Sequence, residues 1–236
     1  PYSINSPVIN FAQSKGLNYS HPDNLKDELE VKKIKELELD IIIFIAYGLI
    51  IPREILTIPK KGCFNLHGSL LPRWRGAAPI QRAIIEGDKK TGITFMKMNE
   101  ELDTGDIVLS KEINIDINDN YQSLEHQLAD LGADSFKEFL DFIETENSFI
   151  RQNNILATYA RKIEKAETKL NWEESAKKVI RRINAYSPNP GAWFEFKGKR
   201  IKILEASLSD KQGKAGTIVS DDLTIACGDQ SIQPQK

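Results

Sequence analysis

An asparagine and a histidine two residues apart, Asn65 and His67, end an apolar segment, and a loop rich in proline, arginine and glycine follows them. Residues two apart in a β-strand point to the same face, so these side chains would project together. A fixed amide donor beside an imidazole that can carry a proton near neutral pH is suited to stabilise a developing oxyanion. In isolation, however, such a pair is more often a structural histidine beside an asparagine that caps a turn.

A nearby carboxylate would favour the catalytic interpretation of Asn65 and His67 over the structural one. The segment NEELDTGD, residues 99–106, is typical of a tight connection between two strands and contains Asp103 and Asp106. If it lies at the same sheet edge as the loop after His67, a carboxylate comes near the imidazole. The carboxylate would orient His67 or a water and accept a proton, while Asn65 and His67 stabilise the oxyanion of an acyl-type transfer. There is no Gly-x-Ser-x-Gly elbow and no cysteine suited to nucleophilic attack, so the attacking group would belong to a substrate.

The elements that must position these residues alternate between helix and strand. The continuously apolar run 40–48 is typical of a strand buried on both faces, and Gly87 is a suitable C-cap. The pattern predicts an α/β, Rossmann-like domain with a mainly parallel sheet, whose ligands bind beyond the carboxyl ends of the strands. We expect helices at 21–39, 52–60, 78–88, 120–144 and 171–187, and strands at 40–48, 62–67, 91–98, 106–115, 192–198, 199–210, 215–221 and 223–229.

The pattern changes towards the C-terminus, where short strands separated by turn residues replace the alternation of helix and strand. A small β-barrel of the oligonucleotide-binding type is one outcome consistent with this. We therefore expect a catalytic α/β domain over 1–146, a linker over 147–165 and a β-barrel domain over 166–236.

Charge is distributed unevenly over the 236 residues. Residues 1–150 contain 16 Lys and Arg against 24 Asp and Glu, and residues 151–236 contain 16 against 10. A basic second part would suit a polyanionic partner, although a surface excess of Lys and Arg can equally serve solubility. No apolar run approaches the ~20 residues of a membrane span. The two cysteines, far apart and without metal-ligand spacing, favour a reducing, cytoplasmic setting and no metal.

The segments NLHGSLLPRWRGAAPIQRAI and GITFMKMNEELDTGDIV resemble the 10-formyltetrahydrofolate-dependent formyltransferases. The resemblance extends through IAYGLIIP, YARKIEKAETKLNW and NPGAWFEF, and RWRGAAPIQ favours the branch that formylates the amino group of methionyl-tRNA. It implies a monomer with the formyl donor 10-formyltetrahydrofolate and initiator methionyl-tRNA as partners. It also implies that Asn65, His67 and Asp103 are catalytic. The folate positions that it implies are Tyr47, Gly48, Leu49 and Ile51, the loop Ser69, Leu70, Leu71 and Pro72, and the backbone near Met98.

Basic residues supply candidate tRNA contacts. In the loop, Arg73 and Arg75 would meet phosphate or the pteroyl-glutamate tail, unless they are solvated loop charges. Trp74 would stack on a nucleotide or cover the folate entrance. The predicted helix 171–187 adds the cluster Lys177, Lys178, Arg181 and Arg182.

Family members begin with a strand, a Gly-Thr-Pro-type loop and a basic loop. PYSINSPVINFAQSKGL matches the segment after these, so we expect the chain to be a fragment. Two alternatives stay open: formyl transfer to another amine, such as an amino sugar nucleotide, and an inactive fragment that binds RNA.

Overall fold

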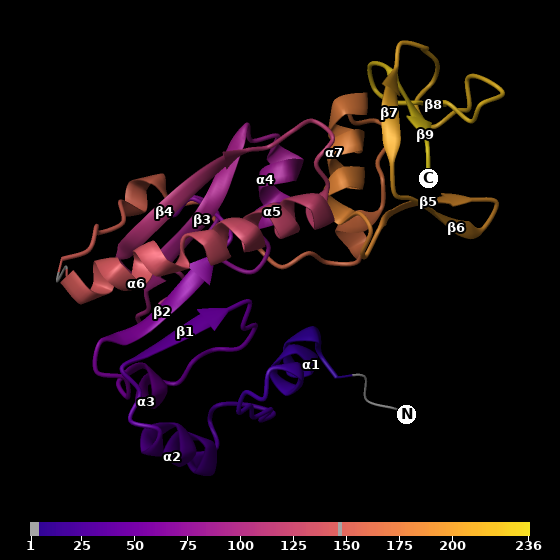
Figure 1. The fold of residues 1–236 in the computed structure, drawn as a ribbon. Coiled ribbons are helices and arrows are strands. Elements are labelled where there is room, and N and C mark those ends of the chain that lie inside the picture. The colour runs from indigo at the N-terminus through magenta and orange to yellow at the C-terminus, as the bar shows by residue number, and fades with distance from the viewer. Residues whose placement is uncertain (1–4, 146–147) are drawn as a thin grey trace.

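The computed structural model describes residues 5–145 and 148–236. Its central sheet has the order β1-β2-β3-β4, with β1 (Ile41–Ile45) parallel to β2 (Gly62–His67). β3 (Lys90–Lys97) is antiparallel to both β2 and β4 (Ile107–Asn114) (Figure 1). The prediction of a mainly parallel sheet is therefore wrong, and the sheet is mixed. The connection from β3 to β4 is too short for the crossover that a parallel pair requires.

The helices near the N-terminus are short. They are α1 (Pro7–Ser14), α2 (Glu28–Glu36) and α3 (Arg53–Leu56). The helix predicted over 21–39 begins only at Glu28, because the Asp27 side chain accepts the Leu29 backbone N–H at 2.9 Å as an N-cap. β1 is not buried on both faces as predicted, since of its five residues only Phe44 is buried and Ile45 is 60% exposed.

Two helices, α5 (Tyr121–Asp134) and α6 (Phe136–Thr145), run end to end along one face of the sheet (Figure 1). The sequence predicted one helix over 120–144, but the helix is interrupted at Ser135, which is the C-cap of α5.

Aromatic packing shows which face of β2 is covered. The ring of Phe139 on α6 stacks on Phe95 with centroids 4.4 Å apart and meets Phe64 edge-on at 5.3 Å. Leu66 packs against α5 so closely that a Cβ on Gly132 would lie 2.7 Å from its methyl group. Because Phe64 and Leu66 face the helices, Asn65 and His67 project from the opposite face.

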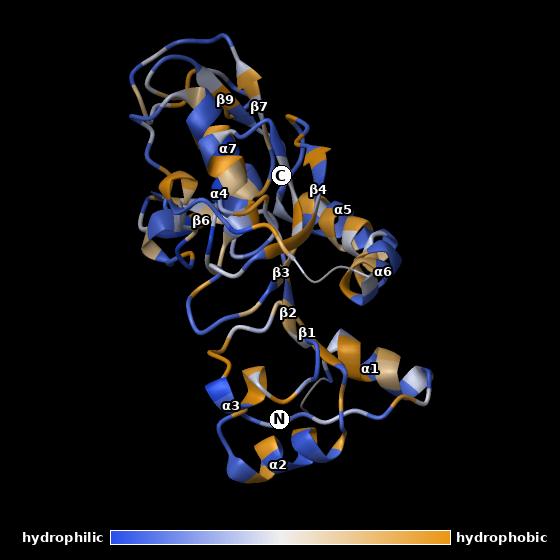
Figure 2. Ribbon diagram, turned by 90° about the vertical axis from the view of Figure 1, so that its left-hand side faces the viewer, coloured by the Kyte–Doolittle hydropathy of each residue, from blue (hydrophilic) through white to orange (hydrophobic). Residues whose placement is uncertain are grey.

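The helix α4 (Pro79–Glu86) ends at Gly87, which has φ 73° and is the predicted C-cap. It packs against α7 (Ala176–Tyr186), whose ribbon alternates hydrophilic and hydrophobic residues (Figure 2). The buried side includes Val179 and Ile183. α7 begins later than predicted because Ser175 caps it by accepting the Lys178 N–H.

The remaining strands form two small sheets. β5 (Ala192–Phe196) and β6 (Lys199–Ile203) make a hairpin, and the second sheet has the order β7-β9-β8. Its strands are β7 (Ala206–Ser209), β8 (Ile225–Ala226) and β9 (Ser231–Pro234). The predicted strand 215–221 contributes only an isolated bridge between Ile218 and Ile225. In the part of the chain that the structure describes, these strands do not close into the predicted barrel.

An ion pair links α4 to the segment that leads into α7. Arg82 donates to both carboxylate oxygens of Glu167, at 2.8 and 3.0 Å, and the Glu164 N–H donates to the same carboxylate at 2.7 Å. Burial alone would raise the pKa of Glu167, but these hydrogen bonds hold it below its ordinary value of 4.5.

We expect Glu167→Gln to lower the free energy of unfolding by about 1.5–3 kcal/mol at pH 7, the usual contribution of hydrogen bonds to charged groups. A carboxylate whose pKa is lowered by folding stabilises the fold above its unfolded pKa and loses this effect as the pH falls through its folded pKa. The deficit should therefore shrink below pH 4.5. Denaturant titrations at several pH values measure it, with exposed Glu164→Gln as the control. A deficit that does not change with pH would contradict the assignment.

Candidate active site

The imidazole of His67 is fixed by the loop that follows it. The ring is 6% exposed, and Nε2 lies 2.8 Å from the backbone oxygen of Trp74. A carbonyl oxygen can only accept, so Nε2 carries a proton and donates it. The Nδ1 atom is left to face the other partner.

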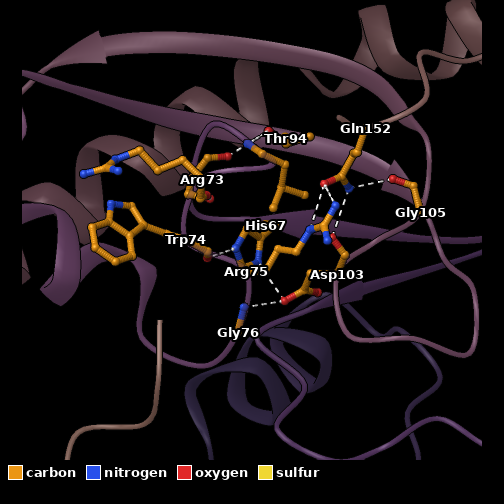
Figure 3. A network of polar contacts seen from close by, with 11 residues as sticks. His67, Arg73, Trp74, Arg75, Gly76, Thr94, Asp103, Gly105 and Gln152 are labelled. Atoms are coloured by element: carbon orange, nitrogen blue, oxygen red, sulfur yellow. Dashed lines mark hydrogen bonds and ion pairs between the residues drawn. The ribbon is translucent and has the colours of Figure 1, made fainter. Parts of the chain in front are cut away.

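That partner is Asp103. Its Oδ2 lies 3.7 Å from His67 Nδ1 and accepts the Gly76 backbone N–H at 2.8 Å (Figure 3). The contact is an ion pair whenever Nδ1 carries a second proton. The structure thus brings together two of the three residues that sequence singled out, at the end of β2.

The route by which Asp103 reaches His67 differs from the expected one. Because β3 runs antiparallel to β2, its carboxyl end at Lys97 lies beside Phe64 and not beside His67. The connection 98–106 must therefore turn back along β2. Gly105 makes the tight turn feasible, since a Cβ there would lie 1.7 Å from the Lys97 backbone oxygen. Asp103 itself has φ 53°, a left-handed conformation that Asp and Asn tolerate better than most residues.

Three consecutive loop residues hold the pair. Trp74 offers its C=O to His67, and Gly76 offers its N–H to Asp103. Arg75 lies between them, and its backbone pairs with the later segment through Thr158 O and the Ala160 N–H, at 2.9 and 2.7 Å. Gly76 has φ 115°, and a Cβ there would lie 2.8 Å from the Ala160 oxygen, so only glycine fits.

The outer side of the loop is tied to Asp88. Arg73 forms a two-pronged ion pair with it, at 2.8 and 2.7 Å, and Trp74 Nε1 donates to it at 2.8 Å. The Arg73 guanidinium also stacks 4.4 Å from the centroid of the Trp74 ring. Both side chains were candidate ligand contacts, and both are engaged in holding the loop.

The side chain of Asn65 is half-buried on the same face of β2 as His67. Within residues 5–145 and 148–236 its amide makes no hydrogen bond to protein. The amide is therefore available to an oxygen of a substrate placed against this face.

Neither cysteine is suited to act as a nucleophile. Burial raises the pKa of Cys63 to about 11 and, together with nearby Asp229, raises that of Cys227 to about 11. Both thiols therefore stay protonated at neutral pH. Among the described residues no cluster of three His, Cys, Asp or Glu side chains could hold a metal ion.

Comparison with known proteins decides the family. The model of the formyl transferase family matches residues 3–140, and that of the formyl transferase C-terminal domain matches residues 162–236. The methionyl-tRNA formyltransferase of Pelagibacter ubique (strain HTCC1062) is 44% identical over 95% of this chain and 73% of its own length.

This chain belongs to the formyltransferase family. A methionyl-tRNA formyltransferase of Neisseria meningitidis serogroup C (strain FAM18) is 40% identical over 96% of the chain and 76% of its own length. The fold agrees with that of the N-formyltransferase of Helicobacter canadensis, solved with folinic acid and dTDP-3-aminofucose. The TM-score is 0.77 at 19% identity, covering 100% of this chain and 86% of the other.

All but one of the folate positions expected of a formyltransferase lie on two loops at one end of the sheet, and the exception, Met98, lies near the start of β2. Since β1 and β2 are parallel, the loops that follow them both begin at the same end of the sheet, where the carboxyl ends of these two strands lie. The first loop exposes Tyr47, Gly48 and Leu49, with Ile51 half-buried. Met98 follows β3 directly and donates its N–H to Cys63 O at 2.8 Å.

The positions in the second loop are built into its own structure. Ser69 Oγ donates to Arg73 O at 2.6 Å, and the Leu71 N–H donates to Thr94 Oγ1 at 3.2 Å. Leu71 and Pro72 are joined by a cis peptide bond. Ser69 and Leu71 are buried, while Leu70 and Pro72 are half-buried and can offer apolar surface to a ligand.

Among the predicted tRNA contacts, the structure argues against Arg75. Arg75 is 2% exposed and bonds to protein amides, so in this arrangement it cannot meet a phosphate at the surface. Arg181 donates to Glu86 O at 3.3 Å at the C-terminus of α4, where a cation is favourable, and Arg182 is paired with Glu174 at 2.6 Å. On α7, only Lys177 and Lys178 have exposed side chains.

Sequence reasoning missed Gln152, which bonds to both Arg75 and the Asp103 loop. It lies in a polar segment without periodicity, so no pattern marks it.

The described residues include no helix long and apolar enough to cross a membrane.

Proposed function

We propose that this formyltransferase moves the formyl group of 10-formyltetrahydrofolate to the α-amino group of initiator methionyl-tRNA. The observation that carries the proposal is the contact of His67 with Asp103 beside an uncommitted Asn65. It is supported by relatives of that name at 40–44% identity over most of the chain.

The site's residues suit direct attack by the substrate amine. The neutral amine adds to the formyl carbon, forming a C–N bond while the carbonyl electron pair moves to oxygen. Asn65 donates to this oxyanion, and a protonated His67 donates through Nδ1, because Nε2 is committed to Trp74. Asp103 takes up the proton that the attacking amine loses, directly or through a water. Collapse breaks the bond from the formyl carbon to N10 of the folate. N10 takes up the proton that Asp103 accepted, directly or through a water, and the carboxylate is regenerated.

The folate is proposed to lie against the loops after β1 and β2. This is consistent with the Helicobacter canadensis enzyme, which was solved with folinic acid, a formylated tetrahydrofolate. Placed there, the formyl carbon would meet the face of β2 that carries Asn65 and His67.

The acceptor has two candidate classes. The Helicobacter canadensis protein was solved with an amino sugar nucleotide, but at 19% identity that likeness speaks to the fold alone. The closer sequence similarity to enzymes of methionyl-tRNA, together with the basic second part of the chain, favours tRNA.

A comparison of acceptors tests the proposal. With 10-formyltetrahydrofolate as donor, formyl transfer should be efficient with methionyl-tRNA and more than about a hundredfold weaker in kcat/KM with dTDP-3-aminofucose. The reverse order would assign the enzyme to amino sugars. Binding of tRNA without any transfer to either acceptor would leave an RNA-binding protein.

The hairpin β5–β6 is a second candidate surface for tRNA. Two cations lie over the indole of Trp193: the Arg200 guanidinium is 4.2 Å from the ring centroid and Lys169 Nζ is 5.3 Å from it. The exposed cations of the hairpin are Lys197, Lys199, Arg200 and Lys202. Trp193 itself is half-buried, and the exposed aromatic ring of the hairpin is that of Phe196. Cations beside aromatic rings are typical of surfaces that bind nucleic acid.

We expect tRNA binding to weaken steeply with salt, because each neutralised phosphate releases counterions. Replacing Lys197, Lys199 and Lys202 with alanine should reduce the log–log salt slope by roughly one unit per lost contact. Alanine at Lys32, Lys33 and Lys35 on α2 changes the net charge equally and should leave the slope unchanged. Filter binding at several salt concentrations measures this, and equal effects of the two triple variants would remove the hairpin from the interface.

A further inference from the structure

One buried glutamine bridges the two loops that hold His67 and Asp103. Gln152 Nε2 donates to the backbone oxygens of Asp103 and Gly105, at 3.0 and 2.7 Å, and its Oε1 accepts from Arg75 Nε and Nη2, at 3.0 and 2.8 Å (Figure 3). Both amide protons and both lone pairs are thus used. Gln152 is 6% exposed, so water does not compete for these bonds.

Arg75 is the other half of the bridge. Its guanidinium is buried, and its remaining side-chain bond is from Nη2 to Asn154 Oδ1 at 2.8 Å. No ion pair between described residues includes it. A buried cation is costly unless its donors are satisfied, so Arg75 holds tightly to these amide oxygens. Its backbone neighbours are Trp74 and Gly76, which contact His67 and Asp103.

The hydrogen bonds of Gln152 therefore fix both the Asp103 turn and the loop that contains Arg75. The Gln152 donors fix the backbone of the left-handed Asp103 turn, and the Gln152 acceptor fixes Arg75 and with it the flanking carbonyl and N–H groups. Moving Gln152 would change the position of Asp103 relative to His67. Among the residues described, the only other hydrogen-bond link between these two loops is the one from the Gly76 N–H to Asp103 itself.

We propose that Gln152 and Arg75 are positioning residues for formyl transfer, which hold Asp103 against His67 without touching substrate. The proposal rests on the proposed function, in which these two side chains do the chemistry. Misplacing a reacting group by about 1 Å costs roughly a hundredfold in rate, so the effect should fall on kcat and not on substrate binding.

Two substitutions at one position separate positioning from plain structural support. Gln152→Glu keeps an acceptor for Arg75 but removes both donors to the Asp103 turn. Gln152→Met removes both functions at similar volume. Asn154→Ala removes one bond to Arg75 and leaves the Asp103 turn intact, so it is the matched control.

We expect kcat to fall by about a hundredfold in both Gln152 variants, with KM for methionyl-tRNA within about threefold of the parent and Asn154→Ala near the parent in both. The melting temperature should fall clearly only in Gln152→Met. If Gln152→Glu keeps the parent kcat, Gln152 merely partners Arg75 and the proposal is overturned.

A readout independent of activity keeps this separate from the proposed function. In protein labelled with ¹⁵N-histidine, the Nδ1 resonance of His67, assigned with a His67→Gln variant, should shift in Gln152→Glu and stay in place in Asn154→Ala. An unshifted resonance overturns the proposal whatever the rates. A shifted resonance in a protein that transfers no formyl group would support positioning while rejecting the proposed function.

Discussion

Asn65→Ala should lower kcat for formyl transfer by about a hundred- to a thousandfold, or ~2.7–4 kcal/mol, the usual cost of removing one oxyanion donor. The amide bonds to no other group in the described protein, so its removal leaves no buried partner unsatisfied. The fold should therefore be preserved. Since the negative charge on this oxygen develops only as the amine attacks and is absent from the bound folate, KM for the folate should stay within about threefold.

Steady-state kinetics with methionyl-tRNA measure the effect. Asn114→Ala, at the exposed end of β4, is the control and should leave kcat unchanged. If Asn65→Ala keeps kcat within about threefold of the parent, Asn65 is not an oxyanion donor.

Asp103→Asn should abolish most formyl transfer while leaving folate affinity largely intact. A positioned proton acceptor typically contributes a hundred- to ten-thousandfold, so we expect a loss of roughly that size. The substitution is structurally mild. Asn accepts the left-handed conformation that Asp103 adopts at φ 53°, and its amide oxygen can still accept the Gly76 N–H.

The alternative is that Asp103 is an ordinary turn residue, for which Asn would serve equally well. Single-turnover transfer and folate binding, measured on the same variant, distinguish the two. Asp106→Asn places the same change on an exposed carboxylate of the same loop and should be silent. Transfer near the parent level in Asp103→Asn would reject the catalytic role, and loss of folate binding as well would indicate that Asp103 builds the pocket.

The strands and helices next to the site could be predicted because their signals are local. The strand 62–67 and the end of α4 at Gly87 follow from apolar runs and a single glycine. The proximity of Asp103 to His67 was also anticipated, although from a sheet topology that proved wrong. Strand direction depends on long-range pairing, which no local pattern encodes.

The supporting residues could not be predicted, because their roles depend on burial and on partners distant in sequence. Arg75 was expected to contact phosphate or the pteroyl-glutamate tail, or to be a solvated loop charge, because arginines in polar loops usually are exposed. Its burial follows from the pairing of its loop with residues near Ala160. Gln152 acquires its role only when that same pairing brings it between the two loops.

The central claim is that the substrate amine attacks the formyl group directly, since none of the described residues at the site is suited to act as a nucleophile. Single-turnover transfer from formyl-labelled 10-formyltetrahydrofolate to methionyl-tRNA, with enzyme in excess and acid quenching, tests it most directly. The account predicts that label lost from the folate appears at once on the methionyl amino group and that none stays on protein. Label bound covalently to the protein, formed and consumed at the rate of transfer, would contradict it.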